Sequence, residues 1–220
     1  MQNDAPLPIP QFLRQAPGHR QLRAAYITLV RLYKTARRIG THDEQWLRVT
    51  MNHEILKIVN DLAPRSLKVL EISGDFWATR VPFKSYTSVS YPGFDVCRTA
   101  LDETFHLIIA EQVFEHLLWP YRAGKNVYKM LNPGGSFIVT TPFLLRVHDC
   151  PVDCSRWTET GLKYLLAECG FDLEKTKTGS WGNRPCVRAN FAKWAYYRPG
   201  VHSLQNEHGF PVSVWAIATK

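Results

Sequence analysis

Hydrophobic positions divide the chain into a helical first part and a later part made of short apolar runs. Over residues 21–39, apolar side chains recur at helical spacing with arginine and lysine on the other side, which predicts an amphipathic basic helix. A second helix is expected to run to about Leu62, with Thr41 or Asp43 as its cap and Pro64 as its stop. The chain therefore begins with an N-terminal helical extension.

From residue 67 the period changes to short runs suited to buried strands. The expected strands are 67–72, 86–90, 105–110, 135–141, 172–179 and 212–219. Helices are expected at about 121–131, ended by the turn 132–135, and at 158–169, opened by Thr158 and closed at Gly170. Strands that alternate with helices indicate an α/β sheet wound on both faces.

Length and composition fit one α/β domain. A chain of 220 residues can form one full core with an appended helical segment, so residues 1–64 are expected to be the arm and extension and 65–220 the domain. No apolar run approaches the length of a transmembrane segment. The first residues also lack the basic start and apolar stretch of a secretory signal, so a cytoplasmic location is expected.

The net charge of +8 lies mostly at the start of the chain. Residues 1–40 hold seven arginines and lysines against one acid, Asp4, which places +6 there. The basic helix 21–39 could be a lid, a contact for an anionic membrane or partner, or a phosphate-binding face for RNA. A lid or packing helix is favoured and nucleic acid is not, because aromatic residues are not interleaved with the basic ones.

Ligands in open α/β sheets bind outside the carboxyl ends of the strands. The loops where chemistry is expected are therefore 71–77, 90–97, 111–117 and 141–157. The first of these follows a buried strand and contains a single glycine, Gly74. It lacks the glycines of a pyrophosphate cradle, which argues against a nicotinamide dehydrogenase.

Two later stretches carry a family resemblance. Phe105-His106 through Glu115-His116, and Leu131-Asn-Pro-Gly-Gly135 through Pro142, resemble motifs of the class I S-adenosylmethionine-dependent methyltransferases, in the type 11-like branch. The resemblance spans roughly residue 67 to the C-terminus. It implies a Rossmann-like, doubly wound, mostly parallel seven-stranded sheet with S-adenosylmethionine as cofactor.

The resemblance places the methionine and ribose parts of the cofactor over the first two strands. Glu71, Ser73 and Gly74 correspond to the loop beneath the methionine, and Ser90 or Tyr91 stands where an acid usually grips the ribose. The loop departs from the family pattern, since Ser73 and Asp75 replace two glycines and Trp77 takes the last small position.

The resemblance also assigns residues to the adenine and the amino group. Asp95 with Val96 matches the pair that reads adenine, and Glu111 with Gln112 matches the residues that hold the amino group and close over the sulfonium. His116 could project toward the cofactor or could only pack at the start of its helix.

The polar segment 141–158 is the expected substrate loop. His148 could take a proton from an acceptor, with Asp149 or Asp153 orienting it. Arg156 is a candidate substrate contact. Alternatively, His148 and Arg156 only fasten the loop.

Two further groups of residues could have a functional or only a packing role. His148, Cys150 and Cys154 suggest a metal, but no second ligand pair follows, so no metal is predicted and the thiols are read as free packing residues. Trp181 and Asn183 follow the expected strand 172–179 and could form a substrate wall or a packed turn.

The sequence thus predicts an enzyme that moves a methyl group from S-adenosylmethionine to an oxygen or nitrogen of a small biosynthetic or sugar-like acceptor. An RNA methyltransferase that uses the basic helix is one alternative. A non-catalytic binding module of the same fold is the other. The acceptor atom and the oligomeric state stay open.

Overall fold

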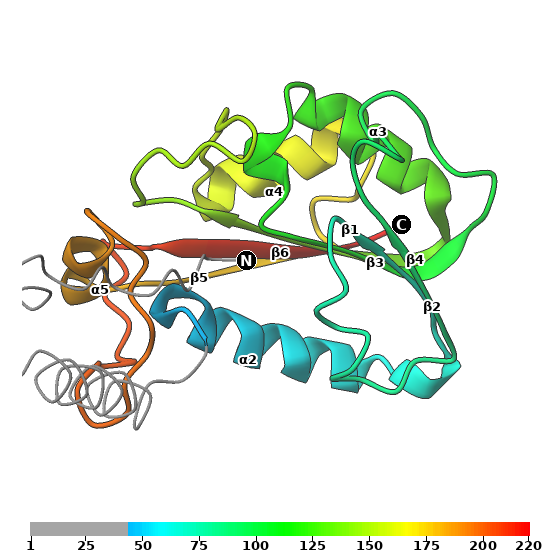
Figure 1. Cartoon of the computed structure of the whole chain (residues 1–220). Coiled ribbons are helices and arrows are strands. Elements are labelled where there is room, and N and C mark those ends of the chain that lie inside the picture. The colour runs from blue at the N-terminus through cyan, green and yellow to red at the C-terminus, as the bar shows by residue number, and fades with distance from the viewer. Residues whose placement is uncertain (1–43) are drawn as a thin grey trace, which may run out of the picture.

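The computed structural model describes residues 44–220, which form one mixed β-sheet with helices on both faces (Figure 1). The strands are β1 (Lys68–Ile72), β2 (Ser85–Val89), β3 (Phe105–Glu111), β4 (Leu131–Pro142), β5 (Thr176–Trp181) and β6 (Ser213–Thr219). Their order across the sheet is β2-β1-β3-β4-β6-β5. The first four strands run parallel, and β6 is antiparallel to both β4 and β5.

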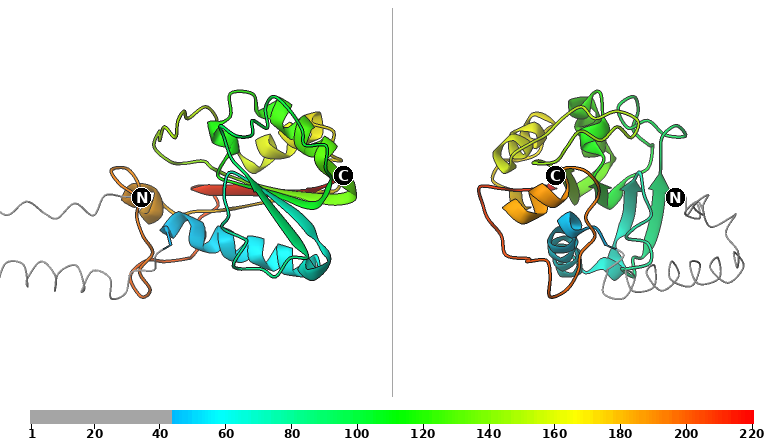
Figure 2. Two further views of the ribbon diagram at one scale, coloured as in Figure 1. Left: turned by 45° about the vertical axis from the view of Figure 1, so that its right-hand side comes forward. Right: turned by 60° about the vertical axis from the view of Figure 1, so that its left-hand side comes forward.

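The longer helices divide between the two faces of the sheet. Helix α2 (Trp46–Asp61) covers one face, while α3 (Pro120–Met130) and α4 (Glu159–Glu168) cover the other (Figures 1 and 2). A short helix, α5 (Arg184–Ala189), and two 3-10 turns, η2 (Pro64–Ser66) and η3 (Phe114–His116), complete the regular elements of the described part of the chain. Among residues 44–220, no helix is long and apolar enough to cross a bilayer.

The prediction of seven strands is wrong for the described residues, which contain six. The doubly wound arrangement is also incomplete, because the crossovers from β1 to β2 (73–84) and from β2 to β3 (90–104) contain no helix. Both are long enough to connect parallel strands without one. Each crossover is anchored in the core by buried side chains, Trp77 and Val81 on the α2 face and Val96 and Cys97 on the α3 and α4 face.

The strand positions otherwise follow the hydrophobic pattern. The predicted strands overlap all six observed ones, and β1 and β3 are fully buried over most of their length, as parallel strands covered on both faces must be. The largest difference is β4, which begins at Leu131 and includes the stretch expected to be only a turn. Its register shifts between Phe105 and Leu107 of β3.

Glycines allow β4 to begin with this irregular pairing. Gly134 has a left-handed backbone with φ of 76°. A Cβ on Gly135 would lie 3.1 Å from the carbonyl oxygen of Phe105 and 3.2 Å from that of His106. The paired glycines therefore serve the close approach of β4 to β3.

The helix ends agree in part with the sequence signals. Thr158 caps α4, since its hydroxyl accepts a hydrogen bond from the amide of Gly161, and Gly170 follows the helix with φ of 112°. The predicted caps of α2, Thr41 and Asp43, lie outside the described residues, as do the arm and the basic helix 21–39.

Helix α2 belongs to the core of the sheet domain. Its buried residues Trp46, Leu47, Met51, Ile55 and Val59 form one hydrophobic cluster with residues of β1, β3 and β6. This helix was predicted to lie in the extension, 1–64. In the described structure it packs against one face of the sheet.

Candidate functional site

The loops predicted to carry chemistry meet at the carboxyl edge of the sheet. In the parallel strands Glu71 pairs with Ser88 and Ile109, so the ends of β2, β1 and β3 lie side by side. The loop after β4 and the start of α2 reach the same edge (Figure 1). Topology therefore brings the predicted cofactor loop and the predicted substrate loop together.

Glu71 holds its own loop together. This buried carboxylate accepts hydrogen bonds from the backbone amides of Phe76 and Trp77, both 3.1 Å long, and from the phenol of Tyr86. Burial, together with the Glu71 carboxylate, raises the pKa of Tyr86, so the phenol remains a donor. The carboxylate is thus already satisfied by the protein.

The predicted glycine loop turns with fewer glycines than the family pattern. Ser73 has a left-handed φ of 66°, and the hydroxyl of Ser88 donates to the carbonyl of Gly74. A Cβ on Gly74 would lie 2.6 Å from a carboxylate oxygen of Glu71. Gly74 is therefore required for the approach of the loop to Glu71.

Glu111, at the end of β3, is also paired within the protein. One oxygen accepts from the guanidinium of Arg48 at 3.1 Å and the other from the indole nitrogen of Trp77 at 3.0 Å. Burial raises the pKa of Glu111, and the positive charge of Arg48 opposes that rise. The neighbouring Gln112 has a left-handed φ of 55°, and its side-chain amide donates to the hydroxyl of Thr140.

The residues assigned to ribose and adenine lie in the β2 to β3 crossover. Ser90 and Tyr91 are both exposed, and Ser90 directly follows the edge strand β2. One oxygen of Asp95 accepts from the amide of Cys97 at 2.9 Å, and the other lies 3.3 Å from Arg98. Val96 is buried in the core.

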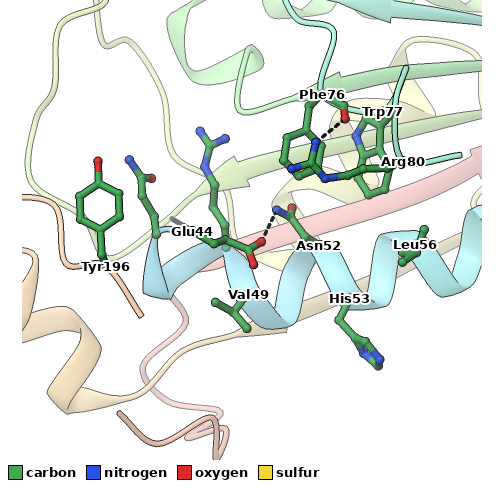
Figure 3. Close-up of a pocket in the computed structure, with 11 residues that line it drawn as sticks. Glu44, Val49, Asn52, His53, Leu56, Phe76, Trp77, Arg80 and Tyr196 are labelled. Carbon is green, nitrogen blue, oxygen red and sulfur yellow. Dashed lines mark hydrogen bonds between the residues drawn. The ribbon is translucent and has the colours of Figure 1, made fainter. Parts of the chain in front are cut away.

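A cavity of about 790 Å³ opens between α2 and the loop 73–84 (Figure 3). Its polar walls include Glu44, Arg48 and Arg80. The carboxylate of Glu44 accepts from the side-chain amide of Asn52 at 2.7 Å, and the guanidinium of Arg80 lies 3.5 Å from the ring centre of Phe76 (Figure 3). The volume is within the range of small-molecule pockets, and the wall offers both signs of charge beside aromatic faces.

A second group of polar residues lies after β3 and β4, and we call it the histidine cluster: Glu115, His116, His148, Asp153 and Arg156. The ring nitrogen Nδ1 of His148 lies 3.2 Å from a carboxylate oxygen of Asp153, and Arg156 contacts both oxygens of Asp153, one at 2.6 Å. Asp149, the other candidate for orienting His148, is exposed.

Three residues of the histidine cluster have shifted pKa values. Hydrogen bonds from Arg156 lower the pKa of Asp153 to about 2, whereas burial lowers the pKa of His148. Glu115 is fully buried, and burial raises its pKa to about 8. A neutral histidine beside a permanent carboxylate can accept a proton near neutral pH.

His116, for which the sequence left open a cofactor contact or a packing role, belongs to this cluster. Its ring meets that of His148 edge to face, with ring centres 5.0 Å apart. Its Nδ1 lies 2.6 Å from the carbonyl oxygen of Val152.

The predicted substrate wall is packed inside the fold. Trp181 is 1% exposed, and its indole donates to the carbonyl of Leu204. Asn183 is 2% exposed. Its side-chain oxygen accepts from the amide of Cys186 and so caps α5, while its side-chain nitrogen donates to the carbonyls of Ser203 and Gln205. Contact of these two residues with a substrate remains only a prediction.

Sequence reasoning missed the cavity wall on α2 and the role of Trp77. Arg48 and Asn52 are spaced four residues apart in α2, which puts them on one side of the helix, and Glu44 lies just before the helix. That spacing was a usable signal. Trp77 was noted only as bulk in a glycine position, and its pairing with Glu111 follows from the fold of the crossover.

Comparisons with known proteins find similarity in the fold but none in the sequence. No protein-family model matches the sequence, and the comparison with curated proteins finds no match either. Among solved structures, a methyltransferase from Clostridium acetobutylicum is 12% identical with a TM-score of 0.51, covering 89% of this chain and 98% of that one. One from Mesorhizobium loti is 13% identical with a TM-score of 0.51, covering 74% and 96%.

A third solved structure, from Thermotoga maritima, is 15% identical with a TM-score of 0.50 and covers 80% of this chain and 98% of that one. All three are described as S-adenosylmethionine-dependent methyltransferases. The chain has the class I methyltransferase fold. This confirms the predicted family resemblance at the level of the fold.

Proposed function

We propose that this protein is a methyltransferase that transfers a methyl group from S-adenosylmethionine to an oxygen or nitrogen atom of a small-molecule acceptor. The observation that carries the proposal is the carboxyl edge of the sheet. There a cavity with charged and aromatic walls adjoins the loop 73–84, and the histidine cluster occupies the next strand ends.

The charges of the cavity suit the methionine part of this cofactor. S-adenosylmethionine carries a carboxylate, an ammonium and a sulfonium group. In this proposal Arg48 and Arg80 bind the carboxylate, Glu44 binds the ammonium, and the face of Phe76 meets the sulfonium. Asp95 and Val96 remain the proposed adenine contacts, with Ser90 and Tyr91 at the ribose.

Glu71, Ser73, Gly74, Glu111 and Gln112 support the cofactor in this proposal chiefly by shaping its floor. Both carboxylates are hydrogen-bonded within the protein, so they position Trp77 and the loop backbone. The cofactor supplies an electrophilic methyl group. The protein supplies orientation and a proton acceptor.

His148 is the proposed proton acceptor. The Nδ1 of His148 donates to the carbonyl of Arg146 at 3.4 Å and lies 3.2 Å from Asp153, which leaves the lone pair on Nε2, and Arg156 keeps Asp153 ionised. The loop after β4 is thus organised around one imidazole. Arg156 acts here through Asp153.

Calorimetry with S-adenosylmethionine and S-adenosylhomocysteine tests the cofactor. We expect one molecule to bind per chain, and Asp95→Ala to weaken binding about tenfold through loss of a charge-assisted hydrogen bond. Asp102→Ala, an exposed acid of the same crossover, is the matched control and should bind normally. Unchanged affinity in Asp95→Ala would refute the adenine assignment.

A non-catalytic binding module of the same fold is the second candidate, and the buried Trp77 favours it. This residue is 1% exposed, packs in the core on the α2 face and donates hydrogen bonds to Glu71 and Glu111, at a position where the family pattern has a small residue. Absence of binding of both cofactor forms to the folded protein would support this candidate over the enzyme.

A further inference from the structure

We propose that Glu115, His116 and His148 bind a divalent transition-metal cation, with zinc as the test ion. One potential ligand atom from each of these three residues lies within 4.8 Å of the other two. Two ligands come from η3, directly after β3, and the third comes from the loop after β4. Binding of a cation by this set does not depend on methyl transfer.

The carboxylate of Glu115 is the strongest indication of a missing partner. The residue is fully buried, and none of the described residues donates a hydrogen bond to either of its oxygens. The Nε2 of His116 lies 3.6 Å from one of these oxygens, which is too long for a hydrogen bond. Buried carboxylates are otherwise paired or coordinate metals.

Hydrogen bonds to the two imidazoles leave one nitrogen of each ring free. The carbonyl of Val152 can only accept, so the Nδ1 of His116 carries the proton of their 2.6 Å contact. The Nδ1 of His148 faces two acceptors, Asp153 at 3.2 Å and the carbonyl of Arg146 at 3.4 Å. Carbonyl and carboxylate partners of this kind orient metal-binding histidines.

The nearby positive charge of Arg156 does not oppose a cation strongly. Its Nη2 lies 3.5 Å from the Nδ1 of His148, on the side of the ring away from the free Nε2, but the guanidinium contacts both oxygens of Asp153, so the pair of Arg156 and Asp153 is close to neutral. The two ring nitrogens and one carboxylate then add one negative charge to the site when Glu115 is ionised.

The ligand types select the class of ion. Two imidazoles and one carboxylate suit zinc and other first-row divalent cations, whereas magnesium and calcium prefer sets made of oxygen alone. Three protein ligands leave at least one coordination position for another molecule, as in catalytic zinc sites. Cys150 and Cys154, which are close to His148 in sequence, are both exposed and do not belong to this group.

Metal binding and proton acceptance would compete for the same nitrogen of His148. A nitrogen that binds a cation cannot accept a proton at the same time, so the metal content of the protein decides between the two roles. This choice leaves the proposed cofactor cavity unaffected, because that cavity lies on the α2 side of the sheet.

Calorimetry of the full chain with zinc chloride tests the site, after removal of bound metal with a chelator. We expect one ion per chain, an increase in the unfolding temperature on zinc addition, and a loss of affinity of at least about 100-fold in Glu115→Gln and in His148→Ala. Thermal unfolding of the metal-free variants establishes that they are folded.

Two controls separate this site from adventitious binding. His53→Ala removes an exposed imidazole of α2, and Cys150→Ser with Cys154→Ser removes the exposed thiols, so both variants should bind zinc as the unchanged protein does. Zinc affinity that persists in Glu115→Gln and His148→Ala, or that disappears with the two thiols, would overturn the proposal. So would absence of any zinc binding.

Discussion

Glu111 and Glu115 lie four residues apart after the same strand, yet their carboxylates have opposite surroundings. Glu111 has a side chain 5% exposed and is bonded on one oxygen by Arg48 and on the other by Trp77. Glu115 is fully buried, and no described residue donates to its oxygens. The carboxylate of Glu111 therefore has a hydrogen-bond donor on each oxygen, whereas that of Glu115 has none among the described residues.

The difference separates support of the fold from binding of a ligand. A buried carboxylate with two donors stabilises the elements that supply them, here α2 and the loop 73–84. A buried carboxylate without donors costs free energy unless a cation or a proton compensates it. The first region therefore shapes the cofactor cavity, and the second is the place to seek an additional ligand.

The largest expected effect comes from removing the side chain that completes the first region. Trp77→Ala deletes a side chain that is 1% exposed and packs in the α2 core, and it leaves Glu111 with one donor fewer. We expect a loss of about 3–5 kcal/mol in the free energy of unfolding, measured by denaturant titration. Trp119→Ala removes a tryptophan that is 53% exposed and should change stability far less.

Equal losses in the two tryptophan variants would contradict the packing role of Trp77. A large loss in Trp77→Ala alone, by contrast, would show that the space where the family has a small residue is part of the core of this protein.

The sequence predicted most of the strands because their burial is local and continuous. Runs such as 105–110 contain almost only apolar residues, and this pattern survives in β3. The sequence did not, however, predict that the crossovers 73–84 and 90–104 would lack helices. Their few apolar anchors, such as Trp77 and Val96, are buried by contacts distant in sequence.

The loops that form the candidate site could be predicted from the sequence, but most contacts between their side chains could not. Strand ends converge by topology, and His148 with Asp153 and Arg156 could be proposed from spacing within one loop. The link between Arg48 and Glu111 spans 63 residues and the grouping of His116 with His148 spans 32, so neither follows from local pattern.

Replacing each of the two glutamates by glutamine tests the comparison directly. In the metal-free protein, Glu111→Gln should cost about 1.5 kcal/mol, at the low end for a bond to a charged group because Arg48 is one-third exposed. Glu115→Gln should cost less than about 1 kcal/mol at pH 7, because a carboxyl with a pKa of about 8 is already mostly neutral there. Denaturant titration of both variants measures the difference.

The order of these two effects is the informative result. A larger loss for Glu115→Gln than for Glu111→Gln would mean that Glu115 has a partner within the protein. That outcome would remove the main reason to place a cation beside it.

The smallest expected effect concerns the thiols beside the histidine cluster. Cys150 and Cys154 are exposed, whereas the other three cysteines are buried, and burial raises the pKa of Cys169 to about 11 and that of Cys186 to about 12. At pH 8 the thiolate is the reacting form, so only the two exposed thiols should react rapidly with a thiol reagent in the folded protein. Cys150→Ser with Cys154→Ser should abolish this fast phase and change stability by less than about 0.5 kcal/mol.

The same reaction in the presence of zinc tests where the ion binds, because zinc binds thiolates tightly. Protection of the fast phase by zinc would place the ion on Cys150 or Cys154. Unchanged reactivity in the presence of zinc agrees with a site made only of carboxylate and imidazole.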